Sequence, residues 1–134
     1  MAGYSGTPLA AKLGIRDGME VSVINAPGDY ASLVAPLPPG ARIKSGASSG
    51  SKLVHLFATR KTDLAEQLKA LRKKLGADSI IWVSWPKKSA RTDTDITEDT
   101  IRAVALPLGF VDIKVCAVND FWSGLKLVVR KELR

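Results

Sequence analysis

Hydrophobic residues along this chain fall into short runs of strand length that alternate with stretches of helical spacing. The runs "KLVHLFATR" and "DSIIWVSWP" are nearly continuous in apolar residues, which is typical of strands covered on both faces in a parallel sheet. Between them Leu64, Leu68, Leu71 and Leu75 recur at helical spacing, and Gly76 follows. This pattern predicts a helix with one buried face between two buried strands.

The remaining segments continue the same alternation of strand and helix. "MEVSVINAP" and "ARIKSG" read as strands, and "FVDIKVCAV" and "LKLVVRKEL" as a final pair joined through the hairpin turn "NDFWSG". "TPLAAKLGI" predicts a short helix with Thr7 as N-cap, and "GDYASLVAP" holds a second short one before Pro36. "ITEDTIRAVALPLG" predicts a helix capped by Thr97, with Ile96 and Ile101 placed as a hydrophobic staple.

This order of elements predicts an α/β fold with a doubly wound, mostly parallel sheet. The last strand returns antiparallel as part of a C-terminal hairpin. The length of 134 residues suits one domain over residues 1–134, with residues 1–16 as an N-terminal helical extension.

Charge gives the surface a bias toward anions without assigning a partner. Twenty Lys and Arg against thirteen Asp and Glu leave a net charge of +7, which attracts nucleic acid, nucleotides or acidic proteins. The basic residues are scattered, so a solvated basic surface is favoured over a dedicated nucleic-acid interface. No apolar run reaches the length of a membrane span and no leader is evident, so we expect a cytoplasmic protein without membrane insertion, as a monomer or a homodimer.

A ligand site is expected where the parallel strands end. In open α/β sheets, ligands bind in the crevice outside the carboxyl ends of the strands. If the final hairpin turn lies at the same edge, two tryptophans could stack a planar anionic ligand while Lys and Arg neutralise its charge. Packing in the core is the favoured alternative for both tryptophans. The candidate binding residues are Asn25, Gly28, Arg60, Lys61, Ser84, Trp85, Lys87, Lys88 and Trp122.

The sequence offers no catalytic constellation and no metal site. His55, the only histidine, sits in the middle of an apolar strand, where a hydrogen-bonded core histidine is favoured over a base or a metal ligand. The acidic stretch "TDTDITED" lacks the glycine and the closing glutamate of a calcium loop. It reads as a flexible loop followed by a helix cap.

The order of elements resembles the Rossmann-like fold of S-adenosylmethionine-dependent methyltransferases over roughly residues 17–134. The stretches "YSGTPLAAKLGI", "SWPKKS" and "WSGLKLVVRKEL" are similar to a family of short bacterial proteins of unknown function. The first resemblance implies a cofactor site at the first strand turn. The second implies a fold and no chemistry.

Two departures from the methyltransferase pattern bear on the cofactor. Such sites use a Gly-rich turn after the first strand and a carboxylate at the end of the second. Here Gly28 stands alone, Pro27 removes an N–H donor, and the second strand ends in Lys44 and Ser45. We therefore expect no cofactor, and S-adenosylmethionine is disfavoured.

Three functions stay open from the sequence. The leading hypothesis is a non-enzymatic binding module for an anionic or nucleotide-like ligand. The alternatives are a small methyltransferase-like enzyme with an atypical cofactor site, and a nucleic-acid-binding protein that uses its basic surface. An open pocket beside "INAPGDY" keeps the enzyme hypothesis open, whereas a pocket closed by Pro27 or Tyr30 excludes it.

Overall fold

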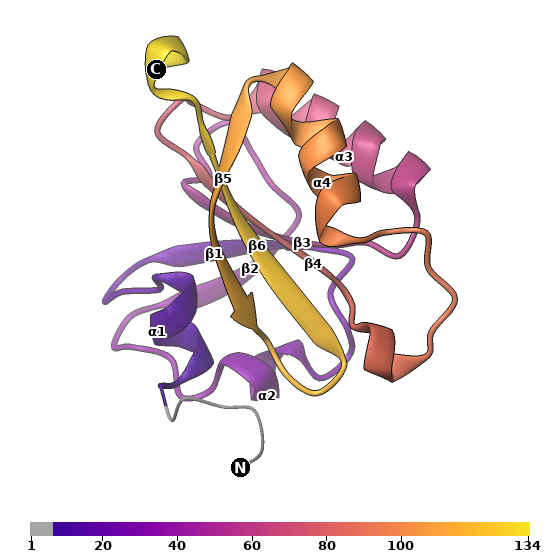
Figure 1. Ribbon diagram of the computed structural model, residues 1–134. Helices are drawn as coiled ribbons and strands as arrows, with labels where there is room; N and C mark the ends of the chain where they lie inside the picture. The colour runs from indigo at the N-terminus through magenta and orange to yellow at the C-terminus, as the bar shows by residue number, and fades with distance from the viewer. Residues whose placement is uncertain (1–6) are drawn as a thin grey trace.

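A computed structural model describes residues 7–134 of the chain and shows a central sheet between two layers of helices (Figure 1). The strand order is β2-β1-β3-β4-β6-β5. The first four strands in that order are parallel, and β6 runs antiparallel to both β4 and β5. The predicted fold class is confirmed. The strands are β1 (Glu20–Ile24), β2 (Arg42–Ser45), β3 (Leu53–Phe57), β4 (Ile80–Pro86), β5 (Phe110–Ala117) and β6 (Trp122–Val129).

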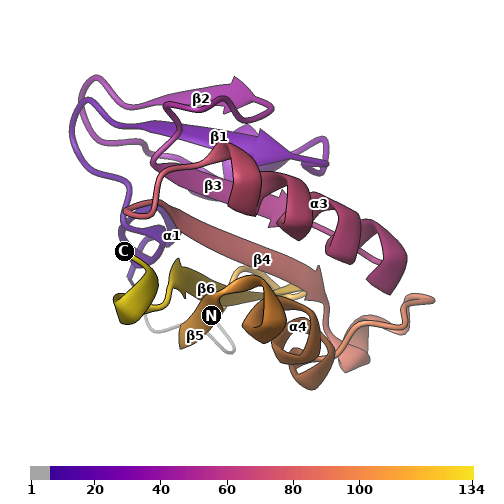
Figure 2. The same ribbon diagram turned by 90° about the horizontal axis from the view of Figure 1, so that it is seen from above.

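Four α-helices among the described residues cover the two faces of the sheet. Figure 1 shows α1 and α2 on one side and α3 and α4 on the other, and Figure 2 shows α3 and α4 together over one face of the sheet. None of the helices within residues 7–134 has the length and apolar character that crossing a bilayer requires. The helices are α1 (Leu9–Leu13), α2 (Tyr30–Val34), α3 (Lys61–Lys74) and α4 (Glu98–Ala105), with short 3₁₀ turns η1 (Lys88–Ala90), η2 (Leu106–Leu108) and η3 (Lys131–Leu133).

The continuous hydrophobic runs are explained by burial on both faces of the sheet. All five residues of β3 are buried, and alternate residues point to opposite sides. Val54 and Leu56 pack toward α3 and α4, whereas Leu53 and Phe57 pack toward α1 and α2. The leucines of α3 complete the first of these two cores, as their spacing predicts.

The N-cap of α4 is the residue that the sequence predicts, whereas the N-cap of α1 is not. Thr97 caps α4, since its Oγ1 accepts a hydrogen bond from the Thr100 amide at 3.2 Å. At α1 the N-cap position is held by Pro8 and not by Thr7, because the helix begins at Leu9. Gly14 ends it in the left-handed conformation, as expected. The rest of the predicted N-terminal extension, residues 1–6, lies outside the described residues.

A buried histidine joins three segments of the fold. The His55 Nδ1 atom lies 2.9 Å from the hydroxyl of Tyr30, and its Nε2 atom lies 2.7 Å from the Ser84 hydroxyl. All three side chains are buried. His55 is therefore the hydrogen-bonded core histidine that the apolar strand predicts, and it ties α2 to β3 and β4.

Burial of His55 predicts a specific loss of stability in acid. Desolvation lowers the pKa of this imidazole from 6.5 to about 3. The unfolded chain therefore takes up a proton near pH 6.5 that the folded chain does not, so stability is complete above that pH and falls below it. We expect the free energy of unfolding in urea to drop by about 1 kcal/mol from about pH 7 to about pH 5.5.

Two variants separate the histidine from other groups in this pH range. His55→Gln removes the titrating ring and should flatten the pH dependence, while Tyr30→Phe keeps the ring and should keep the dependence at lower overall stability. An equal slope in His55→Gln and the unsubstituted protein would contradict this assignment. His55 is the only histidine in the chain, which makes the comparison clean.

Candidate functional site

The chain reverses its direction of winding between β1 and β3. From β1 it moves outward to β2, then crosses back to β3 and continues to β4 on the other side. Such a reversal leaves a crevice outside the carboxyl ends of the two strands, where open α/β sheets bind ligands. Topology alone therefore points to the ends of β1 and β3 at Ile24 and Phe57.

A cleft of about 400 Å³ opens at this point, and we call it the switch-point cleft. Phe57 and Trp122 supply aromatic rings whose centroids lie 5.0 Å apart in a T-shaped arrangement. On the polar side, the Asn25 side-chain amide donates a hydrogen bond to the Asp63 carboxylate at 3.3 Å. Its lining residues are Asn25, Phe57, Ala58, Thr59, Asp63 and Trp122.

The turn after β1 leaves this cleft open. Asn25 has a φ of 58°, a left-handed conformation that asparagine adopts more readily than most residues other than glycine. Tyr30 does not block the cleft, because its side chain is buried and bonded to His55. Pro27 is not among the residues that line it. The open pocket beside "INAPGDY" is thus present.

A second cleft, of about 500 Å³, lies at the carboxyl end of β4, and we call it the β4–α4 cleft. The exit of β4 is fixed against the hairpin, since the Lys87 amide donates a hydrogen bond to the Phe121 carbonyl at 2.8 Å. The lining residues are Trp85, Pro86, Lys87, Lys88, Thr92, Thr94, Ile96, Thr97, Glu98 and Ser123.

The acidic loop between η1 and α4 is anchored, although its composition predicted a flexible segment. The Thr94 hydroxyl donates to the Thr59 carbonyl at 2.6 Å, and the Lys61 amide donates to the Asp95 carboxylate at 2.7 Å. Arg60 pairs with Asp93 at 2.6 Å, and this hydrogen bond lowers the pKa of the Asp93 carboxyl below its ordinary value. The loop is therefore attached along its length to the start of α3.

The structure divides the predicted single crevice in two. Trp122 pairs with Pro86 across β6 and β4, whereas Trp85 pairs with Ser123, so the two tryptophans point to opposite faces of the sheet. Trp85 is buried against the core under α3 and α4, and Trp122 packs on the core under α1 and α2. One planar ligand cannot stack on both rings.

The other predicted residues are distributed among several environments. Asn25 and Trp122 line the switch-point cleft, and Trp85, Lys87 and Lys88 line the β4–α4 cleft. The remaining four line neither cleft: Ser84 is buried and bonded to His55, Arg60 and Lys61 lie at the start of α3 beside the acidic loop, and Gly28 lies in the turn after β1.

Asp63 is the lining residue of most chemical interest that sequence reasoning missed. It stands in the first turn of α3, where acidic residues are common because they favour the positive end of the helix dipole. Because helix-dipole stabilisation explains an acid at this position, no pattern in the sequence indicated that Asp63 lies beside the carboxyl ends of β1 and β3, where the structure places it. Phe57, Ala58 and Thr59 were seen only as the end of a buried strand.

Comparison with known proteins identifies the fold and no family. No family model matches the sequence, and no curated protein matches it. The chain is similar to a SAM-dependent methyltransferase from Aquifex aeolicus, with a TM-score of 0.63 and 10% identity over 91% of this chain and 88% of that one. It is also similar to Aeropyrum pernix fibrillarin solved with natively bound S-adenosyl-L-methionine, with a TM-score of 0.60 and 12% identity over 94% and 70% of the chains.

A third solved structure, LepI in complex with SAM, has a TM-score of 0.56 and 12% identity over 92% of this chain. The match covers 47% of LepI, so this chain corresponds to about half of that protein. At such identities the likeness shows a methyltransferase-like fold.

These structures correct our expectation that the chain takes no cofactor. Proteins of this fold are described as dependent on S-adenosylmethionine or were solved with it bound. Our expectation was wrong because it inferred the absence of a cofactor from residue types alone, namely the lone Gly28 after the first strand and the missing carboxylate after the second. In this chain the turn after β1 contains Asn25 in the left-handed conformation.

Anchoring of the acidic loop through Thr94 leads to a testable expectation. Thr94→Val removes the hydrogen bond to the Thr59 carbonyl and the one that the Thr94 hydroxyl accepts from the Ile96 amide at 3.1 Å. We expect a loss of about 1 kcal/mol in unfolding free energy and faster hydrogen exchange at Ile96. Asp93→Asn, which removes an exposed ion pair, serves as the control and should change both quantities less.

Proposed function

We propose that this chain is a small methyltransferase-like protein that binds S-adenosylmethionine in the switch-point cleft. The observation that carries the proposal is an open, partly polar cleft at the reversal between β1 and β3 of a fold shared with S-adenosylmethionine-dependent methyltransferases. Membership of the short bacterial family belongs to the same proposal and rests on the three sequence stretches that resemble it.

The residues of the cleft fit such a molecule in size and in chemistry. A volume of about 400 Å³ falls within the range of small-molecule sites. The partly exposed ring of Trp122, which packs edge-on against the buried ring of Phe57, supplies an apolar surface suited to a flat base such as adenine. The Asp63 carboxylate and the Asn25 amide offer acceptors and donors for hydroxyl or ammonium groups.

The charge of the cleft also favours this molecule over the anionic ligand that the sequence suggested. Asp63 is the charged residue among those that line the cleft, although the chain as a whole carries +7. A carboxylate at a partly enclosed site attracts a cation more strongly than it does in bulk water. S-adenosylmethionine carries a positive sulfonium that makes its methyl group available to a nucleophile.

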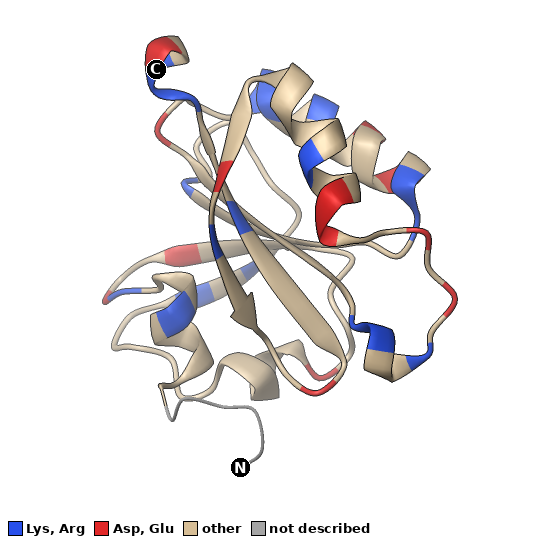
Figure 3. Cartoon of the chain, viewed as in Figure 1, with Lys and Arg blue, Asp and Glu red and all other residues tan. Residues whose placement is uncertain are grey.

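The hypothesis of a non-enzymatic module has gained no support. The open pocket beside the turn after β1 keeps the enzyme hypothesis open, and the structural neighbours favour the enzyme over the module. The basic surface gives no better support for nucleic acid, because Figure 3 shows Lys and Arg spread over many elements of the chain.

Isothermal titration calorimetry with S-adenosylmethionine and S-adenosylhomocysteine tests the proposal. Asp63→Asn removes the negative charge of the cleft at nearly constant shape, and we expect affinity for S-adenosylmethionine to fall by about tenfold or more. Trp122→Ala removes the aromatic wall and should weaken both compounds.

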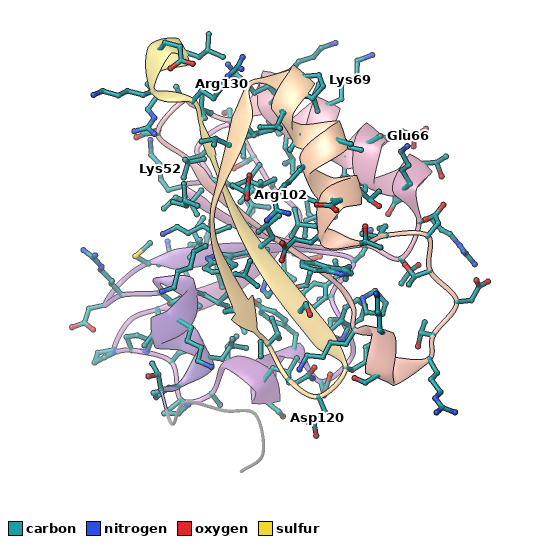
Figure 4. The ribbon with its side chains drawn as sticks, in the orientation of Figure 1. Lys52, Glu66, Lys69, Arg102, Asp120 and Arg130 are labelled. Carbon is teal, nitrogen blue, oxygen red and sulfur yellow. The ribbon has the colours of Figure 1, made fainter. Side chains whose placement is uncertain are left out.

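Glu66→Gln is the matched control for the charge change. Glu66 lies on the same helix as Asp63, is exposed and does not line the cleft (Figure 4). Its substitution should leave the affinity unchanged. Failure of the unsubstituted protein to bind either compound, or equal affinity in Asp63→Asn and Glu66→Gln, would refute the proposed function.

A further inference from the structure

The β4–α4 cleft has the features of a second small-molecule site. Its volume of about 500 Å³ is within the range for such sites. Trp85 and Ile96 are buried residues at its apolar side and belong to the core under α3 and α4. The hydroxyls of Thr92 and Ser123 supply polar groups among its lining residues. An apolar wall with a few polar groups is the usual composition of a ligand pocket.

The carboxylates around this cleft are already engaged. Asp93 pairs with Arg60, and Asp95 accepts a hydrogen bond from the Lys61 amide. At the start of α4, the carboxylates of Glu98 and Asp99 bind one guanidinium, that of Arg102, at 2.6 and 3.0 Å. Arg102 also binds Asp112 at 2.9 Å, so it links α4 to β5 (Figure 4).

The two lysines of the cleft, in contrast, have no carboxylate within ion-pair distance among residues 7–134. Lys87 and Lys88 directly follow Pro86, the last residue of β4, and both line the cleft. The acid that lines it with them is Glu98, whose charge is shared with Arg102. The local balance is therefore positive, which favours an anion.

The two clefts are neighbours of opposite charge. Trp122 lines the switch-point cleft and the next residue of β6, Ser123, lines the β4–α4 cleft. Thr59 and Thr94, one from each cleft, are joined by the 2.6 Å hydrogen bond between them. A carboxylate thus marks one cleft and a pair of lysines marks the other.

We propose that the β4–α4 cleft binds a small organic anion, a carboxylate or a phosphate ester, that carries a flat apolar group. The apolar group packs against Trp85 and Ile96, and the anionic group pairs with Lys87 and Lys88. The role of this ligand as methyl acceptor rests on the proposed function, whereas its binding does not.

Fluorine NMR titrations with four probes that share one flat apolar ring test the charge requirement of the cleft. The probes are 4-fluorobenzoate, 4-fluorophenyl phosphate, neutral 4-fluorobenzyl alcohol and cationic 4-fluorobenzylamine. We expect one or both anions to bind at least about tenfold more tightly than the neutral and cationic probes. The two anions distinguish a carboxylate site from a phosphate site.

The chain provides a matched control for the lysines. Lys87→Gln with Lys88→Gln removes the pair in the cleft, and Lys73→Gln with Lys74→Gln removes an equal charge from the tandem lysines at the end of α3. We expect about tenfold weaker anion binding in the first double variant and little change in the second. Equal affinities in the two double variants, or no preference for the anions, would overturn the proposal.

Calorimetry with S-adenosylmethionine on the same proteins separates this inference from the proposed function. Anion binding that depends on Lys87 and Lys88 in a chain that does not bind S-adenosylmethionine would support the second site and refute the cofactor site. Binding of S-adenosylmethionine without selective anion binding would support the cofactor site and refute the second site.

Discussion

The hydrogen bonds of His55 are the constraint on which the candidate sites depend. The imidazole sits between the Tyr30 hydroxyl and the Ser84 hydroxyl, so α2, β3 and β4 are joined in the interior. A neutral ring has one donor nitrogen and one acceptor nitrogen, and both are satisfied here. The Tyr30 hydroxyl points inward to this hydrogen bond, and Tyr30 is not among the residues that line the switch-point cleft. An unpaired polar atom at this depth would cost about 1 to 3 kcal/mol.

The same edge of the sheet holds two clefts because the side chains of its strands alternate between the two faces. Successive residues such as Trp122 and Ser123 face opposite sides, so the hairpin contributes a wall to each cleft. The acidic loop then adds its own residues to one cleft while its Thr94 is bonded to Thr59 of the other. The two clefts therefore share a wall, which consists of the carboxyl ends of the strands and the acidic loop bonded to them.

Periodicity predicted the parts of the fold that depend on local burial. The leucine spacing of α3, the continuous run of β3 and the capping of α4 by Thr97 each follow from a few adjacent residues. The division into two clefts depends instead on the register of β4 with β6, which pairs Pro86 with Trp122. Asn25 and Asp63 are 38 residues apart, and no local pattern brings them together.

The expectation of no cofactor rested on residue types after the first and second strands, whereas the shape of the cleft depends on the conformation of the turn after β1. A glycine is common in the turn after the first strand because it accepts positive φ without steric cost. Asn25 reaches φ 58° at a cost of about 1 kcal/mol, and its amide gains a hydrogen bond to Asp63 that glycine cannot make. Asn25 therefore both makes the turn and contacts the carboxylate of the cleft. In a chain of net charge +7, Asp63 gives the lining of the switch-point cleft a local negative charge that the total charge does not reveal.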